Sequence, residues 1–339
     1  MPRNLFVAGS NSYGQLGLGN TNDEASFVLV PPFSDSNVIQ VSYGGNHCVA
    51  VCANGDCFVV GSNSNRQLGI DTEDKVLEWE LHPLCTQGVK IAEVACGWEH
   101  TILRTTDGKA YLFGDNTYGQ LGFEGKQLRE SVVKVAAGLR HSILATESGR
   151  IFGFGANRHG QLNKQSCPVL PLTEILKIDA SSKIQISCGQ FHTVILADKK
   201  LYSFGNNKNG QLPVDTETIS ATPIKIGCGW NASFVLYSDH SLRIYGKNTH
   251  GQIGCPDVSA RVHLIEGIAD FAVGSEHGVA LTTAGQLLSW GWNEHGNCGV
   301  DSEGKNIYEP AQVKIAWNGN IVGLFAGQAT SCFLVDCDS

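Results

Sequence analysis

Residues of chemically reactive types are concentrated in one short segment, SWGWNEHGNCG at 289–299. Within it, Glu294, His295 and Cys298 could bind a metal ion or activate a nucleophile, because carboxylate, imidazole and thiolate groups serve both purposes. The chain has no C-x-x-C pair, H-E-x-x-H motif, Walker loop, G-x-S-x-G elbow or dinucleotide-binding fingerprint. The sequence thus offers no catalytic, metal or cofactor motif, and the segment has to be interpreted from its position in the chain.

This segment is one copy of a repeated motif. The pattern G-x-N-x-x-G-Q-L-G is complete at 9–17 and again at 114–122, and weaker copies begin at residues 61, 155, 205, 246 and 291. Glycine favours turns that need a positive φ, and asparagine bonds to nearby backbone groups. We therefore assign structural roles to the motif positions Gly9, Asn11, Gly14, Gly114, Asn116 and Gly119.

A second motif, V-x-x-G-x-x-H followed by an apolar strand, accounts for five histidines: His47, His100, His141, His192 and His277. Two further copies carry Ala232 and Thr330 in place of the histidine. Equivalent positions in several repeats cannot together form one active site. Because a half-buried imidazole needs hydrogen-bond partners, we expect these histidines to make structural hydrogen bonds within or between repeats.

The spacing of the two motifs predicts the architecture. The interval from the second motif to the next first motif is 16 or 17 residues, whereas the interval from first to second varies from 24 to 36. Segments such as HTILRTTDGKAYLFG at 100–114 indicate a strand, an Asp-Gly turn and a strand. Seven such repeats are typical of an all-β, seven-bladed β-propeller. We expect one domain over residues 1–339, its ring closed by pairing of the N-terminal strand LFVAG with the C-terminal strand SCFLVDC.

The composition limits the classes of partner. A formal net charge of −8 without a basic run argues against direct binding of nucleic acid. No apolar run approaches the roughly 20 residues that span a bilayer, so we expect no membrane contact. The twelve cysteines are spread along the chain, and we expect them to be reduced. A cytoplasmic protein is expected, with the nucleus as a second location.

Function is expected where one repeat departs from the others. Six such residues are candidates for binding a protein partner: Trp79, Trp98, Glu276, Trp292, Glu294 and His295. Trp98 and Trp292 occupy turn positions, where aromatic side chains can anchor a partner, whereas Trp290 suits the core. Trp79 lies in the acidic segment 71–80, DTEDKVLEWE, which is either a solvated loop or a docking loop for a basic partner.

Over nearly the whole chain, the two motifs resemble the repeats of the regulator-of-chromosome-condensation propeller family. The resemblance implies the seven-bladed fold but leaves the function open, because this fold serves exchange factors, a UV-B photoreceptor, ubiquitin-ligase modules and scaffolds. The photoreceptor relies on tryptophans of successive blades, whereas the corresponding slot here holds tryptophan only at Trp98 and Trp230. A guanine-nucleotide exchange factor for a Ran-like small GTPase is the main alternative function.

Four segments resemble a group of short yeast propellers, the alpha-tubulin suppressor or killer-toxin-insensitivity propellers: ACGW at 95–98, GSEHG at 274–278, WGWNEHGNCG at 290–299 and GQATSCFLV at 327–335. This resemblance implies a non-catalytic scaffold that forms a heterodimer with a small zinc-binding electron-donor protein. The pair would support diphthamide biosynthesis on elongation factor 2 and Elongator-dependent modification of tRNA wobble uridines, with the Elongator complex as a further partner. We expect no enzymatic activity and no cofactor in the propeller itself.

Overall fold

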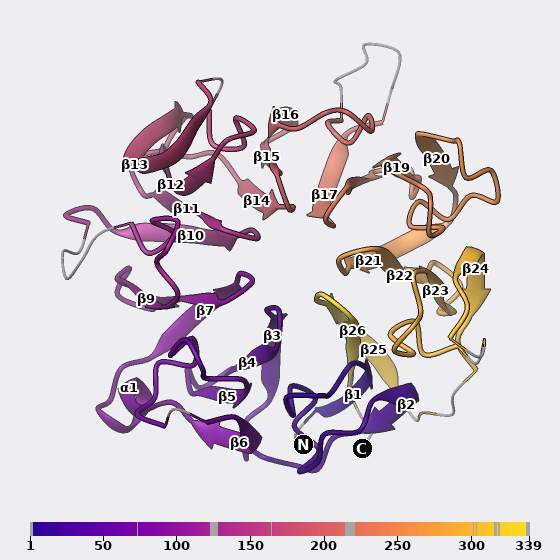
Figure 1. The fold of residues 1–339 in the computed structure, drawn as a ribbon, viewed down its shortest axis with the longest axis horizontal. Coiled ribbons are helices and arrows are strands. Elements are labelled where there is room, and N and C mark those ends of the chain that lie inside the picture. The colour runs from indigo at the N-terminus through magenta and orange to yellow at the C-terminus, as the bar shows by residue number, and fades with distance from the viewer. Residues whose placement is uncertain are drawn as a thin grey trace.

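Seven antiparallel sheets are arranged in a ring around a central channel (Figure 1). This computed structural model describes residues 3–72, 74–122, 128–163, 165–213, 221–300, 302, 304–314, 317 and 319–336. Each sheet forms one blade, so the predicted all-β, seven-bladed propeller is confirmed. Within the described residues, the only helix is the four-residue α1 (Pro83–Thr86), and none is long or apolar enough to cross a membrane.

Blades 1 to 6 follow one another along the chain, and in each of them the first strand lies next to the channel (Figure 1). Blade 1 contains β3 (Val38–Tyr43), β4 (His47–Cys52), β5 (Cys57–Gly61) and β6 (Val76–Leu81), and blade 2 contains β7 (Ile91–Cys96), β8 (His100–Thr105) and β9 (Ala110–Gly114). Blade 3 contains β10 (Val132–Ala137), β11 (His141–Thr146), β12 (Arg150–Asn157) and β13 (Cys167–Lys177), and blade 4 contains β14 (Ile184–Cys188), β15 (His192–Ala197) and β16 (Lys200–Gly205). Blade 5 contains β17 (Pro223–Cys228), β18 (Ala232–Tyr237), β19 (Leu242–Gly246) and β20 (Val262–Ile265), and blade 6 contains β21 (Ile268–Val273), β22 (His277–Thr282), β23 (Leu287–Gly291) and β24 (Ile307–Gln312).

Blade 7 combines strands from the two ends of the chain. From the channel outward it contains β25 (Asn320–Ala326), β26 (Thr330–Asp336), β1 (Asn4–Gly9) and β2 (Glu24–Leu29). β1 pairs antiparallel with β26 over the whole length of β1 (Figure 1). Phe6 of β1 stacks on Phe333 of β26 with ring centroids 5.0 Å apart. The predicted closure of the ring is therefore confirmed.

The first motif forms the tight turn that follows the third strand of each blade. Asn11 shows its role: the side-chain oxygen accepts a hydrogen bond from the backbone N–H of Leu16 at 2.9 Å. All seven motif asparagines accept from the residue five positions later, and Cys298 occupies the leucine position in the last copy. The side chain of Cys298 is fully buried, which answers the question raised by segment 289–299: this thiol fills a core position of the repeat.

The motif histidines join each blade to the next. In five blades, the imidazole Nε2 of the motif histidine lies within hydrogen-bond distance of a side-chain hydroxyl in the next blade. This hydroxyl belongs to the residue immediately after the position that is equivalent to the histidine. We call these contacts the histidine latches. The pairs are His47–Thr101 at 2.8 Å, His100–Ser142 at 3.0 Å, His141–Thr193 at 3.1 Å, His192–Ser233 at 2.9 Å and His277–Ser331 at 2.9 Å. These five side chains are about 1% exposed or less, so the latches lie inside the blade junctions.

The electrostatics of the latches favour neutral imidazole. Ser142 donates its hydroxyl hydrogen to the carbonyl of Gln120 at 2.7 Å, so Nε2–H of His100 donates to Ser142 and Nδ1 is left without a proton. Nδ1 of all five latch histidines is buried and has no hydrogen-bond partner among the described residues. Burial lowers the pKa of His47 and His141 to about 3 and that of His100, His192 and His277 to about 4.

Two blade junctions lack a histidine latch. Between blades 5 and 6 the corresponding residues are Ala232 and Gly278, and the space is filled by Trp290, whose indole is fully buried. A Cβ on Gly278 would lie 2.6 Å from the Trp290 ring, so glycine is required there. Trp290 is thus a core residue, as the sequence indicated. Between blades 7 and 1 the corresponding residues are Thr330 and Cys48.

Candidate functional site

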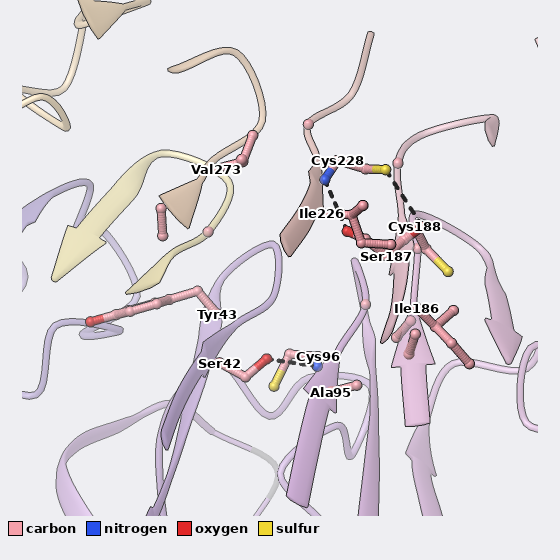
Figure 2. A pocket seen from close by; sticks show the side chains of 18 of the residues that line it. Ser42, Tyr43, Ala95, Cys96, Ile186, Ser187, Cys188, Ile226, Cys228 and Val273 are labelled. Carbon is pink, nitrogen blue, oxygen red and sulfur yellow. Dashed lines mark hydrogen bonds between the residues drawn. The ribbon is translucent and has the colours of Figure 1, made fainter. Parts of the chain in front are cut away.

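The central channel has a volume of about 630 Å³ and is lined by the innermost strands. Cys96, Cys188 and Cys228 end three of these strands and lie on its wall (Figure 2). The backbone N–H of Cys96 donates to Ser42 Oγ of the preceding blade at 3.0 Å, and Cys228 donates in the same way to Ser187 at 2.9 Å. These residues therefore help to hold neighbouring blades together around the channel.

The thiols of the channel are suited to packing. Burial raises the pKa of Cys96 to about 12 and that of Cys228 to about 11, and it also raises the pKa of Cys188. A thiol reacts as the thiolate, so these groups are weak nucleophiles and weak metal ligands at neutral pH. All cysteines of the described residues are free, and in that part of the chain no three His, Cys, Asp or Glu side chains are grouped to hold a metal.

We predict that the channel thiols react slowly with iodoacetamide in the native protein. At pH 8, Cys96 and Cys228 are expected to be alkylated at least about ten-fold more slowly in the native protein than in the unfolded chain, because burial keeps their thiolate fraction small. Peptide mapping by mass spectrometry measures the individual rates. All of these rates should become similar in guanidinium chloride, and rapid labelling of Cys96 in the native state would contradict the prediction.

A second hollow lies at the face where the innermost strands end. Its volume is about 340 Å³. We call it the tryptophan pocket; its lining side chains include Trp98, Trp230, Trp292, Glu276, His250 and His295, and its lining segments include Gly45, Ser275, Gln328 and Ala329. These residues come from turns of blades 1, 2, 5, 6 and 7, so only the closed ring assembles the pocket.

Trp98 and Trp230 form the centre of the pocket. They belong to blades 2 and 5 but lie with ring centroids 5.7 Å apart, tilted by 50°. The backbone carbonyl of Trp98 accepts a hydrogen bond from Gly45 N–H at 2.8 Å, and the backbone N–H of Trp230 donates to the carbonyl of Ser275 at 2.7 Å. A Cβ on Gly45 would lie 2.7 Å from the Trp98 carbonyl. Close backbone contacts between blades thus position both indoles, which are half-buried.

Two acidic groups and an imidazole complete the pocket and its rim. The Glu276 carboxylate accepts hydrogen bonds from the side-chain amides of Asn231, at 3.0 Å, and Gln252. Trp292 meets His295 edge to face at 5.4 Å. Nδ1 of His295 lies 2.7 Å from a carboxylate oxygen of Asp23, which connects the turn of blade 6 to the loop between β1 and β2.

The structure brings four of the six predicted partner-binding residues together: Trp98, Glu276, Trp292 and His295 all line the tryptophan pocket. Glu294 is exposed and adjoins the pocket in sequence. Trp79 lies apart from it. Its ring stacks on Phe33 at 4.5 Å and packs against the core between blades 7 and 1. In segment 71–80, Glu73 lies outside the described residues.

Sequence reasoning missed Trp230 as a site residue. The signal was present, because Trp230 and Trp98 both follow the second-motif glycine and so project from equivalent turns at one face of the ring. The contact between the Trp98 and Trp230 rings depends on the width of the channel, and the spacing of the motifs along the chain does not predict that width. His250 was also missed; it occupies the position of the first motif that His295 occupies in the last copy.

Comparison with known proteins identifies the family. The family model described as the RCC1-like domain matches residues 4–333. The chain therefore belongs to the RCC1-like propeller family, as the two repeat motifs predicted. Prp20p from Saccharomyces cerevisiae, a protein described as binding Gsp1p and histones, has a similar crystal structure with a TM-score of 0.84 and 22% identity, covering 100% of this chain and 92% of that one.

Two curated relatives match most of the chain. A protein of Mus musculus named "Secretion-regulating guanine nucleotide exchange factor" is 32% identical over 91% of this chain and 78% of its own length. The Arabidopsis thaliana "Ultraviolet-B receptor UVR8" is 31% identical over 87% of this chain and 62% of its own length. Relatives of similar identity thus carry different functions on one fold.

These relatives correct one expectation from the sequence. The prediction that the chain has no enzymatic activity is wrong. The mouse relative is named as an exchange factor, and an exchange factor catalyses the release of nucleotide from a GTPase. The prediction rested on the absence of catalytic motifs. An exchange factor needs none, since it acts by binding a GTPase in a state that releases its nucleotide, with no covalent chemistry of its own.

Proposed function

We propose that the tryptophan pocket is the binding site for a small zinc-binding electron-donor protein. The resulting heterodimer supports diphthamide biosynthesis on elongation factor 2 and Elongator-dependent modification of tRNA wobble uridines, in the cytoplasm with the nucleus as a second location. The observation that carries the proposal is convergence. Each of the four segments that resemble the yeast alpha-tubulin suppressor propellers, 95–98, 274–278, 290–299 and 327–335, contributes at least one residue to the pocket.

The geometry of the pocket supports a role in protein binding. Tryptophans that are half-buried in a concave site contribute much of the free energy at protein interfaces, because the rigid indole offers a large apolar contact area and itself loses little conformational entropy on binding. The closed ring holds the indoles in place before the partner arrives, which lowers the entropic cost of association. The propeller would then present its partner in one fixed orientation.

We predict that Trp98→Ala weakens the heterodimer about 30-fold, which corresponds to about 2 kcal/mol for the loss of a central aromatic anchor. Isothermal titration calorimetry with the purified zinc protein measures the dissociation constant. Tyr308→Ala is the matched control, because Tyr308 is an exposed aromatic residue on the outer strand β24. Wild-type affinity in the Trp98 variant, or no complex with the unmodified propeller, would overturn the proposal.

A second candidate function is guanine-nucleotide exchange on a Ran-like small GTPase. The observation that favours it is the 32% identity to the mouse exchange factor over 91% of this chain. Release of a fluorescent GDP analogue from the GTPase, with and without the propeller, tests this function directly. Accelerated release together with no binding of the zinc protein would select exchange over the heterodimer, and unchanged release would exclude it.

A further inference from the structure

The tryptophan pocket combines aromatic faces with a single carboxylate. Trp98, Trp230 and Trp292 supply three indoles, and Glu276 supplies the only carboxylate that lines the pocket among the described residues. The face of an indole carries negative charge density and attracts cations, more strongly when the site is shielded from water. An aromatic site with an enclosed carboxylate therefore has the composition of a cation-binding cage.

The charge of Glu276 is not balanced within the described part of the chain. Its carboxylate is half-buried, and its two recorded partners are the neutral amides of Asn231 and Gln252. These amides fix the orientation of the carboxylate and leave its negative charge in place. No lysine or arginine of the described residues forms an ion pair with it. A partly desolvated carboxylate of this kind is best satisfied by a cation.

The two histidines of the pocket already have other partners. Nδ1 of His295 is paired with Asp23 at 2.7 Å, and Nδ1 of His250 is 3.3 Å from the side-chain amide of Asn306. The pocket thus retains one unpaired negative group beside three aromatic faces. An apolar ligand would cover this half-buried carboxylate without pairing its charge, and an anionic ligand would be repelled by it.

We propose that the tryptophan pocket binds a cationic side chain, lysine or arginine, of a protein partner. The ammonium or guanidinium group pairs with Glu276, and the aliphatic stem of the side chain packs against Trp98, Trp230 and Trp292. This inference deepens the proposed function by naming the chemistry of recognition. The test uses small probes in place of the partner. The cation-binding proposal can therefore be refuted while the proposed heterodimer is supported, and the heterodimer can be refuted while cation binding is supported.

The probes are the N-acetyl methylamides of lysine and arginine, with the norleucine derivative as an uncharged control of similar shape. Indole N–H resonances of the ¹⁵N-labelled full-length protein, assigned with Trp98→Phe and Trp292→Phe, report binding. We expect saturable shifts with a dissociation constant on the order of 10 mM for at least one cation, and no saturation with norleucine.

Glu276→Gln separates charge from shape, since glutamine keeps the size of the side chain and removes its charge. This variant is expected to bind the cationic probe at least about five-fold more weakly, whereas Glu309→Gln, which alters an exposed carboxylate on the outer strand β24, should bind it like the unmodified protein. Equal binding of norleucine, unchanged affinity in Glu276→Gln, or no saturable shift with either cation would overturn the proposal.

Discussion

Lowering the pH from 7 to 5 is expected to remove most of the stability of the propeller. The five latch histidines have pKa values of about 3 to 4 in the folded protein, below the value of about 6.5 for an exposed imidazole. Between these values the unfolded chain binds more protons than the folded one. The stabilisation is therefore complete above pH 6.5 and is lost as the pH falls through that window.

The expected loss in the free energy of unfolding is large because the five latch histidines contribute together. At pH 5 each histidine contributes a loss of up to about 2 kcal/mol, or on the order of 10 kcal/mol in all. That is comparable to the whole free energy of unfolding of a typical domain. Urea denaturation at several pH values measures the free energy of unfolding. The slope of this free energy against pH, between pH 6 and 5, gives the number of protons taken up on unfolding.

The slope also tests whether the latches are responsible. His141→Gln should reduce the proton uptake by about one, whereas His159→Gln, which alters an exposed histidine, serves as the control and should leave the slope unchanged. Stability that is constant from pH 7 to 5 would show that these imidazoles bind protons as readily in the folded protein as in the unfolded chain, and it would refute the neutral latch.

Replacement of a motif glycine should be the most damaging single substitution. Gly97 has no positive φ, but a Cβ there would lie 2.0 Å from the ring of His100 and 2.7 Å from the carbonyl of Gly138 in the next blade. Both neighbours belong to a packed junction and cannot move apart without breaking a latch. Gly97→Ala is therefore expected to reduce the free energy of unfolding by more than about 3 kcal/mol.

Gly285→Ala is the matched control for this prediction. Gly285 has a φ of +79° and no atom within 4 Å of the added Cβ, so its substitution tests backbone strain alone. Its expected cost is about 1 kcal/mol. Urea denaturation at pH 7.5 compares the two variants. Similar losses in both would mean that the contact with His100 does not explain the G-x-x-H motif.

The family, the number of blades and the closure of the ring follow from the sequence alone. Repeats that cannot bury an apolar face by themselves must stack, and an orphan strand at each end can satisfy its backbone only by pairing with the other. Trp290 and Cys298 could likewise be placed, because each occupies a slot that its counterparts in other repeats fill with core residues.

Only the tertiary structure decided which residues meet across the ring. Trp98 and Trp230 belong to blades 2 and 5 and touch because two turns project over the same channel. Trp79 stood out in the sequence as strongly as Trp98, yet its indole is stacked on Phe33 at a blade junction. Motif spacing describes each blade by itself, whereas the tryptophan pocket depends on the curvature of the ring, which is set by packing between blades and has no local signature in the chain.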